Sequence, residues 1–141
     1  MSLQDIELVR AQFEGVNERN FEGAMDLYAD DVVLLVHTSF GLETGTFEGK
    51  EAVGDWFGQW FQIFSPHYRF EIEEAREIGD VIFIHAKHGG RGRTSGVEVR
   101  DETSYLYSVR SGRVVRVELF GERDEALQAA SLPKRSETET D

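Results

Sequence analysis

The chain has 141 residues, of which 15 are Lys or Arg and 27 are Asp or Glu, so its formal net charge is −12. The length suits one domain with a single core, and the acidic excess opposes binding to nucleic acid or to an anionic membrane surface. Without Cys, the chain has no disulfide and no thiol nucleophile. No stretch approaches the roughly 18 apolar residues of a membrane span. We therefore expect a cytoplasmic protein with neither nucleic acid nor membrane as a partner.

The N-terminal third of the sequence predicts two helices and a strand. A first helix is indicated by apolar residues at helical spacing, namely Ile6, Val9, Phe13 and Val16. Asn20 can cap a second, short helix that carries Phe21, Ala24, Met25 and Tyr28. Residues 32–37 form an apolar run rich in β-branched side chains, which predicts a buried strand, and residues 38–48 are expected to form a loop.

Residues 49–64, GKEAVGDWFGQWFQIF, predict an amphipathic helix with a very large apolar face. Five of the chain's aromatic residues fall within this segment, at positions 56, 57, 60, 61 and 64. Each aromatic side chain buries roughly 150–250 Å² when it is covered. Such a helix requires a concave apolar partner, and Ser65-Pro66 is expected to end it.

From Tyr68 onward the apolar period changes from three or four residues to two, which predicts an antiparallel meander of four strands. The first expected strand starts at Tyr68, and the other three cover residues 81–88, 97–109 and 113–120. A glycine-rich loop occupies residues 89–96. A short helix is expected at residues 124–130. Residues 133–141 lack apolar periodicity and are predicted to be a disordered tail after a single domain of residues 1–132.

Helices followed by a run of strands predict the α+β class, with the helices packed on one face of a strongly curved antiparallel sheet. We expect the sheet to cup the aromatic helix and to leave a cavity where the two do not meet.

Three segments of the chain are similar to the nuclear transport factor two-like superfamily: FEGAMDLYADDVVLLV, FEGKEAVGDWFGQW and GRTSGVEVRDETSYLYSVRSGRVVRVELFGERDEAL. They look most like its SnoaL-like branch, which also resembles ketosteroid isomerases and polyketide cyclases. The resemblance covers residues 5–132 and implies a cone-shaped α+β barrel with an internal pocket, often in a homodimer. The superfamily holds isomerases, cyclases, dehydratases, epoxide hydrolases and non-catalytic binders, so the resemblance leaves function open.

The ketosteroid isomerase site does not carry over intact. Tyr28 matches the tyrosine of the family's LYADD motif, but Phe57 replaces its companion tyrosine. The positions of the family's general base, first-helix tyrosine and late-strand acid are occupied by Val36 beside His37, by Gln12 or Phe13, and by about Thr103. The usual isomerase reaction is therefore not expected in its usual form.

Asp101, His85 and His37 are the candidate catalytic residues. Alternation in the strand at 97–109 puts Asp101 on the same face as Tyr105 and Tyr107, where burial would raise its pKa and make it a general acid or base. The alternative is that Asp101 lies near the strand end, wetted, ion-paired or turned outward. For His85 the pattern leaves open which face of the strand lines the pocket. The alternative is that His85 is a structural or surface residue, as a lone histidine in a strand usually is.

Aromatic and hydroxyl side chains are the candidate ligand-binding residues: Tyr28, Trp56, Trp60, Phe83, Thr103, Tyr105 and Tyr107. They would hold a flat apolar ligand, with phenol hydroxyls as hydrogen-bond donors. The alternative is that they form only the core. His85 and His88 are three apart, which does not suit one strand face, so neither a metal nor a cofactor is expected.

Two functions remain open at this point. The first is a small-molecule pocket protein of the SnoaL-like type that transfers a proton, as an isomerase, cyclase or hydrolase-like enzyme, on an apolar or polycyclic ligand. The second is a non-catalytic ligand-binding or dimerisation module. A carboxylate or imidazole that faces the cavity would favour the enzyme.

Overall fold

The computed structural model describes residues 3–37, 44–62, 68–91 and 98–131. Its helices are α1 Leu3–Asn17, α2 Phe21–Met25, α3 Lys50–Gln62 and α4 Arg123–Ser131. Its strands are β1 Tyr28–Val36, β2 Gly45–Glu48, β3 Arg69–Ile78, β4 Val81–Arg91, β5 Glu98–Arg110 and β6 Arg113–Phe120. The predicted helix end at 63–67, most of the glycine-rich loop and the predicted tail at 133–141 lie outside the described residues. None of the described helices is long and apolar enough to cross a membrane.

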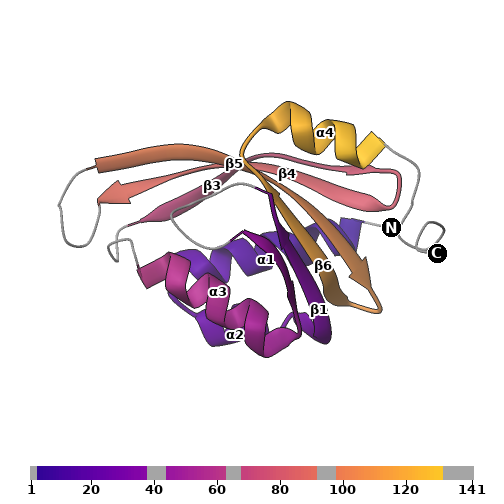
Figure 1. Ribbon diagram of the computed structural model, residues 1–141, viewed down its shortest axis with the longest axis horizontal. Helices are drawn as coiled ribbons and strands as arrows, with labels where there is room; N and C mark the ends of the chain where they lie inside the picture. The colour runs from indigo at the N-terminus through magenta and orange to yellow at the C-terminus, as the bar shows by residue number, and fades with distance from the viewer. Residues whose placement is uncertain (1–2, 38–43, 63–67, 92–97, 132–141) are drawn as a thin grey trace.

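One twisted sheet organises the fold, with the strand order β2-β1-β6-β5-β4-β3. The β1 and β6 strands run parallel, and the other neighbouring pairs run antiparallel. Among the described strands, β2 and β3 are the two edges, so the sheet is not closed into a barrel. Figure 1 shows α1, α2 and α3 on one side of this sheet and α4 on the other. The predicted α+β class is confirmed.

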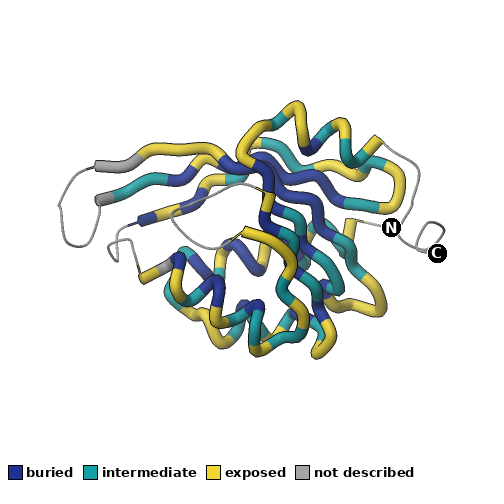
Figure 2. The backbone as a smooth tube through the Cα atoms, viewed as in Figure 1, coloured by how far each residue is buried: buried dark blue, intermediate teal, exposed yellow. Residues whose placement is uncertain are grey.

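The predicted apolar stripes of α1 and α3 form the core against the inner face of the sheet. On α1 the buried apolar residues are Val9, Phe13 and Val16, and on α3 they are Val53, Trp56, Phe57 and Trp60. Figure 2 shows both helices buried where they meet the sheet and exposed on the opposite side. The three- and four-residue spacing of these side chains is what places them on one helix face.

Three parts of the sequence prediction differ from the structure. Tyr28 begins β1 rather than belonging to the second helix, because its backbone pairs with Val114 of β6. The predicted loop at 38–48 contains β2, which pairs with residues 33–36 of β1. These pairings join segments distant in sequence, which local patterns do not report. Finally, α4 covers the outer face of the sheet, not the face that holds the other helices.

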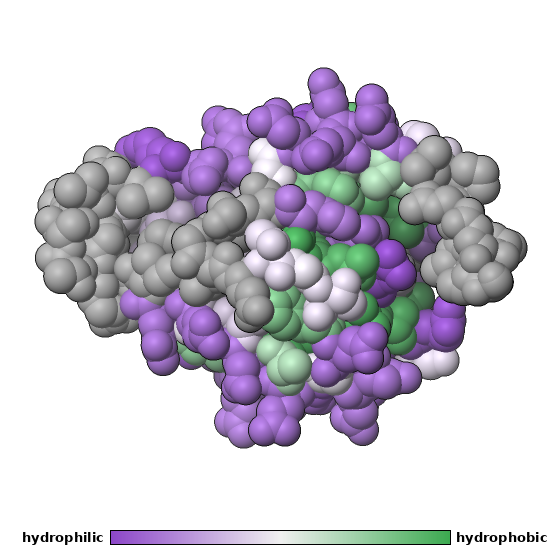
Figure 3. Space-filling view, in the orientation of Figure 1, coloured by the Kyte–Doolittle hydropathy of each residue, from purple (hydrophilic) through white to green (hydrophobic). Residues whose placement is uncertain are grey.

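A second apolar cluster holds α4 on the outer face. It consists of Phe83, Leu106, Phe120 and Ala126. At its edge the Arg123 guanidinium donates two hydrogen bonds to the Glu74 carboxylate, at 2.6 and 2.8 Å. The same guanidinium lies 5.6 Å from the centre of the Phe83 ring. In Figure 3, hydrophilic side chains cover most of the visible surface and apolar ones gather near its middle.

The aromatic face of α3 leads to a first prediction. Trp60 is only 1% exposed and contacts the rings of Trp56 and Phe70. Trp60→Ala should therefore lower the free energy of unfolding by about 3–5 kcal/mol, measured in urea, because it removes a large buried side chain and leaves a cavity. Gln59→Ala, an exposed substitution on the same helix, is the control. A loss below about 1 kcal/mol for Trp60→Ala would contradict this role.

Candidate functional site

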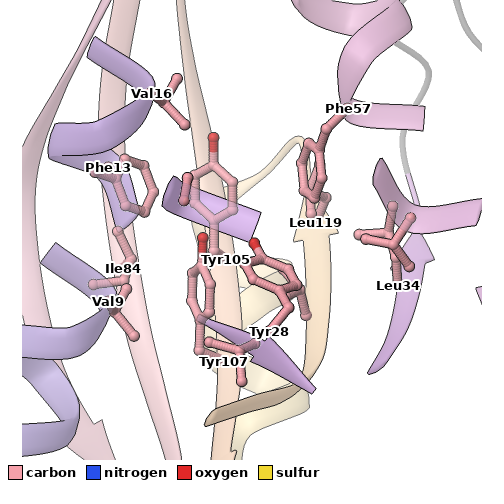
Figure 4. Packing of buried hydrophobic residues seen from close by; sticks show 14 of the residues in the cluster. Val9, Phe13, Val16, Tyr28, Leu34, Phe57, Ile84, Tyr105, Tyr107 and Leu119 are labelled. Atoms are coloured by element: carbon pink, nitrogen blue, oxygen red, sulfur yellow. The ribbon is translucent and has the colours of Figure 1, made fainter. Parts of the chain in front are cut away.

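Three tyrosines from two strands meet in the interior of the fold. Alternation along β5 points Thr103, Tyr105 and Tyr107 toward the helices, and Tyr28 joins them from β1. The rings of Tyr105 and Tyr107 are stacked, with their centroids 6.0 Å apart. Figure 4 shows these tyrosines between Phe13 of α1 and Phe57 of α3.

A small cavity lies beside these tyrosines. Its volume is about 10 Å³, close to the roughly 10–15 Å³ that one water molecule needs. It is lined by Gln12, Phe13, Val16, Phe57, Trp60, Phe70, Tyr105 and Tyr107. The lining thus combines an apolar wall with neutral hydrogen-bonding groups, and neither a carboxylate nor an imidazole belongs to it.

The hydroxyls in this interior are not equally satisfied. Tyr107 donates a hydrogen bond to the Gln12 side-chain oxygen at 2.8 Å. The hydroxyls of Tyr28 and Tyr105 are buried and have no partner in hydrogen-bond geometry among the described residues. Burial raises the pKa of all three phenols. The neighbouring hydroxyls of Tyr107 and Thr103 oppose the shift at Tyr28 and at Tyr105, respectively, without reaching bonding geometry. Each phenol is therefore a neutral donor at physiological pH.

A histidine lies next to this interior, held between two hydroxyls. The Nδ1 atom of His88 is 2.5 Å from the Tyr68 hydroxyl, and its Nε2 atom is 2.6 Å from Thr103 Oγ1. A neutral imidazole has one donor and one acceptor nitrogen, and two hydroxyls can serve both. The phenol of Tyr68 is more acidic than the Thr103 hydroxyl, so it suits the nitrogen that accepts. We therefore assign Tyr68 as the donor to Nδ1, and the Nε2–H group donates to Thr103 Oγ1.

Packing keeps this imidazole neutral. Its ring stacks on Phe70, with centroids 4.9 Å apart, and the edge of Trp60 lies against it at 5.8 Å. Burial lowers the pKa of His88 to about 4, and the carboxylates of Asp101 and Glu102 only partly oppose this shift. Trp60 and Phe70 also line the cavity, so they connect His88 to the tyrosines.

Close contacts fix the positions of Phe70 and Tyr68. The side-chain amide of Asn17 donates to the backbone oxygen of Phe70 at 2.9 Å and its oxygen accepts from the Phe70 N–H at 2.8 Å, which joins the end of α1 to β3. Gly90 lies so close that a Cβ there would be 2.6 Å from the Tyr68 Cα. Only glycine fits this approach of β4 to Tyr68.

The sequence model of the SnoaL-like domain family matches residues 9–117, most of the chain. The chain belongs to the SnoaL-like domain family. By contrast, none of the curated proteins compared with it by sequence matches.

Solved structures share the fold of this SnoaL-like domain. A protein from Jannaschia sp. CCS1 described as a SnoaL-like polyketide cyclase is 18% identical, with a TM-score of 0.74 over 94% of each chain. TerC, co-crystallized with polyporic acid, is 18% identical, with a TM-score of 0.72 over 92% of this chain and 99% of its own. A ketosteroid isomerase-like protein from Catenulispora acidiphila, in complex with trimethylamine, is 20% identical, with a TM-score of 0.69 over 90% of this chain and 94% of its own. At these identities the likeness shows the fold alone.

The structure does not place the predicted catalytic residues in the cavity of this SnoaL-like domain. Asp101 is exposed, and its carboxylate accepts the backbone N–H of Glu102 at 2.8 Å. Of the two interpretations of Asp101, the structure agrees with an exposed position near the strand end and not with one that faces the core. Asp101 has the parity of Tyr105, but it lies near the start of β5, where residues 100–102 are exposed. It is nonetheless the register partner of His88.

His85 and His37 also lie away from the cavity. His85 is on the outer face of the sheet, next to Ser104 and Glu102. His37 follows the end of β1, where its Nε2 is 2.9 Å from a Glu118 carboxylate oxygen and its ring stacks on Phe120. Neither Asp101 nor His85 thus lines the cavity, so the structure does not support a catalytic role for them there.

Most of the predicted ligand-binding residues lie in the interior, although not all line the cavity. Trp60, Tyr105 and Tyr107 line it, whereas Tyr28, Trp56 and Thr103 are buried in the surrounding core. Phe83 is different, since it packs under α4 on the outer face. Its role in an interior pocket is therefore not supported by its position.

Sequence reasoning missed the polar residues that the interior brings together, namely Gln12, Tyr68 and His88. A signal for His88 was present, because it follows Ile82, Ile84 and Ala86 in the period of two, and all four are buried. For Gln12 and Tyr68 no local pattern predicts the partner, since Tyr107 and His88 are 95 and 20 residues away.

Burial of His88 leads to a pH prediction. Because its pKa is about 4 in the folded chain and near 6.5 when unperturbed, the unfolded chain takes up this proton first as the pH falls. The stability due to neutral His88 is complete above about pH 6.5 and is lost toward pH 4, at about 1.4 kcal/mol per pKa unit.

Urea unfolding of wild type and His88→Gln at pH 7 and pH 4.5 measures this loss, because the carboxylates that the two proteins share cancel. The wild type should lose about 2–3 kcal/mol more than the variant over this range. Equal pH dependence in both would show that His88 is accessible to protons in the folded state.

Proposed function

We propose that this SnoaL-like domain binds a small, apolar, oxygen-bearing molecule in its interior, with the hydroxyls of Tyr28 and Tyr105 as hydrogen-bond donors. The observation that carries the proposal is that both hydroxyls are buried without a partner among the described residues, and that Tyr105 lines the cavity. An unsatisfied buried polar group costs about 1–3 kcal/mol. An acceptor oxygen placed between these donors recovers that cost.

The rest of the lining supports the same class of ligand. Phe13, Phe57, Trp60 and Phe70 present ring faces and edges, which suit a flat apolar body. A carbonyl or phenol oxygen matches neutral donors better than a carboxylate does, because no cationic side chain belongs to the cavity lining. The structure of TerC with polyporic acid supports the view that this fold accepts an organic ligand.

Binding requires the cavity to enlarge. Its volume of about 10 Å³ is close to the space that one water molecule needs, so a larger ligand must move side chains of the wall. Phe57 and Trp60 belong to α3. Side-chain contacts, and not backbone pairing, hold this helix on the sheet. A shift of this helix is therefore the opening that we propose.

The binding site is tested by changing a single hydroxyl. In Tyr105→Phe, affinity for a planar ketone or phenol such as 1-tetralone or 2-naphthol, followed by quenching of tryptophan fluorescence, should fall about tenfold, since one hydrogen bond is lost. The stability of the variant should stay the same or rise, because an unsatisfied hydroxyl is removed.

Tyr68→Phe is the matched control, because Tyr68 does not line the cavity. It should leave affinity unchanged. A Tyr105→Phe protein that is destabilised by more than about 1 kcal/mol and binds both probes as the wild type does would overturn the proposal.

A second candidate function, proton transfer, rests on His88. This imidazole is buried and neutral, and it contacts Trp60 and Phe70 at the wall of the cavity. A neutral imidazole bonded to a phenol can accept and return a proton. His88 does not itself line the cavity, so an isomerase, cyclase or hydrolase-like reaction that uses it as the base would need the enlarged cavity to bring a bound ketone to this imidazole. A non-catalytic binder needs His88 only for packing.

Exchange of the α-protons of 1-tetralone in D₂O, followed by NMR, separates the two. An enzyme should accelerate the exchange, and His88→Gln should abolish the acceleration while probe binding persists. No acceleration by the wild type would leave binding as the function. The homodimer that the family resemblance implies stays a prediction, which sedimentation equilibrium would check.

A further inference from the structure

Three side chains with metal-ligand atoms come together on the outer face of the sheet, opposite the tyrosine cavity. One ligand atom from each of Glu73, His85 and Glu102 lies within 4.8 Å of the other two. They come from the neighbouring strands β3, β4 and β5. Glu73 is the extra residue at a register shift between Ile72 and Glu74. Such a bulge redirects side chains from the normal alternation.

The imidazole of this cluster is held for coordination. His85 Nδ1 is 2.8 Å from Ser104 Oγ, and its Nε2 is 2.7 Å from a Glu102 carboxylate oxygen. The side chain of His85 is only 9% exposed, so its orientation is fixed by packing. The Nε2 atom therefore contacts Glu102, which is itself a member of the cluster. A metal-binding histidine usually donates its second ring N–H to an oxygen acceptor, and the Ser104 hydroxyl can serve as that acceptor for His85 Nδ1.

A lysine now balances the charge of the carboxylates. The Lys87 ammonium is 3.0 Å from a Glu73 carboxylate oxygen. Lys87 is half exposed and its long side chain can swing away. The Glu73 carboxylate is thus already paired with a positive charge, and a metal ion could replace the Lys87 ammonium that carries it.

We propose that Glu73, His85 and Glu102 bind a divalent transition-metal ion such as Zn²⁺. One imidazole and two carboxylates suit such an ion, whereas Ca²⁺ and Mg²⁺ prefer oxygen ligands alone. Glu74 is not a ligand, because its carboxylate is bonded to Arg123. The ion displaces the Lys87 ammonium from Glu73.

The cluster lies at the margin of an open concavity of about 1010 Å³. Glu102 and Lys87 line this concavity together with Arg69, Glu71 and Arg100, whereas Glu73 and His85 do not. Three protein ligands with a fourth position open are typical of catalytic rather than structural zinc sites. A small anion that enters this concavity would meet both the ion and arginine side chains.

Calorimetric titration of the full chain with ZnCl₂, after treatment with a chelator, tests the site. The wild type should bind one ion, and His85→Gln and Glu102→Gln should each weaken binding by about tenfold or more. Lys87→Met should tighten it, because the competing ammonium is removed. His37→Gln is the matched control, since it breaks another histidine–glutamate pair and should leave affinity unchanged.

Circular dichroism establishes that each variant is folded. If His85→Gln does not fold, Glu102→Gln still tests the site, because Glu102 is exposed and its substitution should not disturb the core. Absence of saturable binding by the wild type at millimolar zinc would overturn the proposal. So would equal affinity in His85→Gln, Glu102→Gln and His37→Gln, which is the result expected for non-specific binding to an acidic surface.

Discussion

Burial of the aromatic face of α3 against the inner face of the sheet is the interaction on which the rest of the structure depends. Trp56, Phe57 and Trp60 are all less than a tenth exposed. Trp60 packs against Phe70 of β3 and against His88 of β4, so one helix side chain joins two strands. Burying each such ring removes roughly 150–250 Å² of surface from water, which outweighs most single polar contacts. The same filling reduces the interior space to a volume of about 10 Å³.

A core filled with tyrosines and tryptophans carries polar atoms into a space without bulk water. The structure satisfies some of them through long-range pairs, such as Tyr107 with Gln12 and His88 with Tyr68. Among the tyrosine hydroxyls of the described residues, those of Tyr28 and Tyr105 are the exceptions. Buried polar groups are rarely left unsatisfied without a bound molecule or a function. These two hydroxyls, rather than the volume of the cavity, therefore support the proposed function.

The two faces of β4 separate two kinds of chemistry. His85 and His88 are three residues apart, so strand alternation turns His85 outward and His88 inward. Inside, hydroxyls and rings surround a neutral imidazole. Outside, carboxylates and a lysine surround the other one. The outer cluster lies next to α4, whose contacts with Phe83 and Glu74 keep that helix on this face. A ligand in the interior and an ion on the outer face would therefore not compete for the same side chains.

The sequence by itself determined most of the elements and the class of the fold. Spacing at three and four residues identified α1 and α3, and alternation identified β3 to β6, because both patterns follow from burial of one face of a local element. It also placed Tyr105 and Tyr107 inward. Only the tertiary structure decided where the strands end relative to the core, and so exposed Asp101 despite its parity. Likewise, only strand pairing brought Glu73 and Glu102 to His85 and turned His88 between Tyr68 and Thr103. These contacts join residues from different strands, and the free energy that forms them comes from packing of the whole core, which no local pattern encodes.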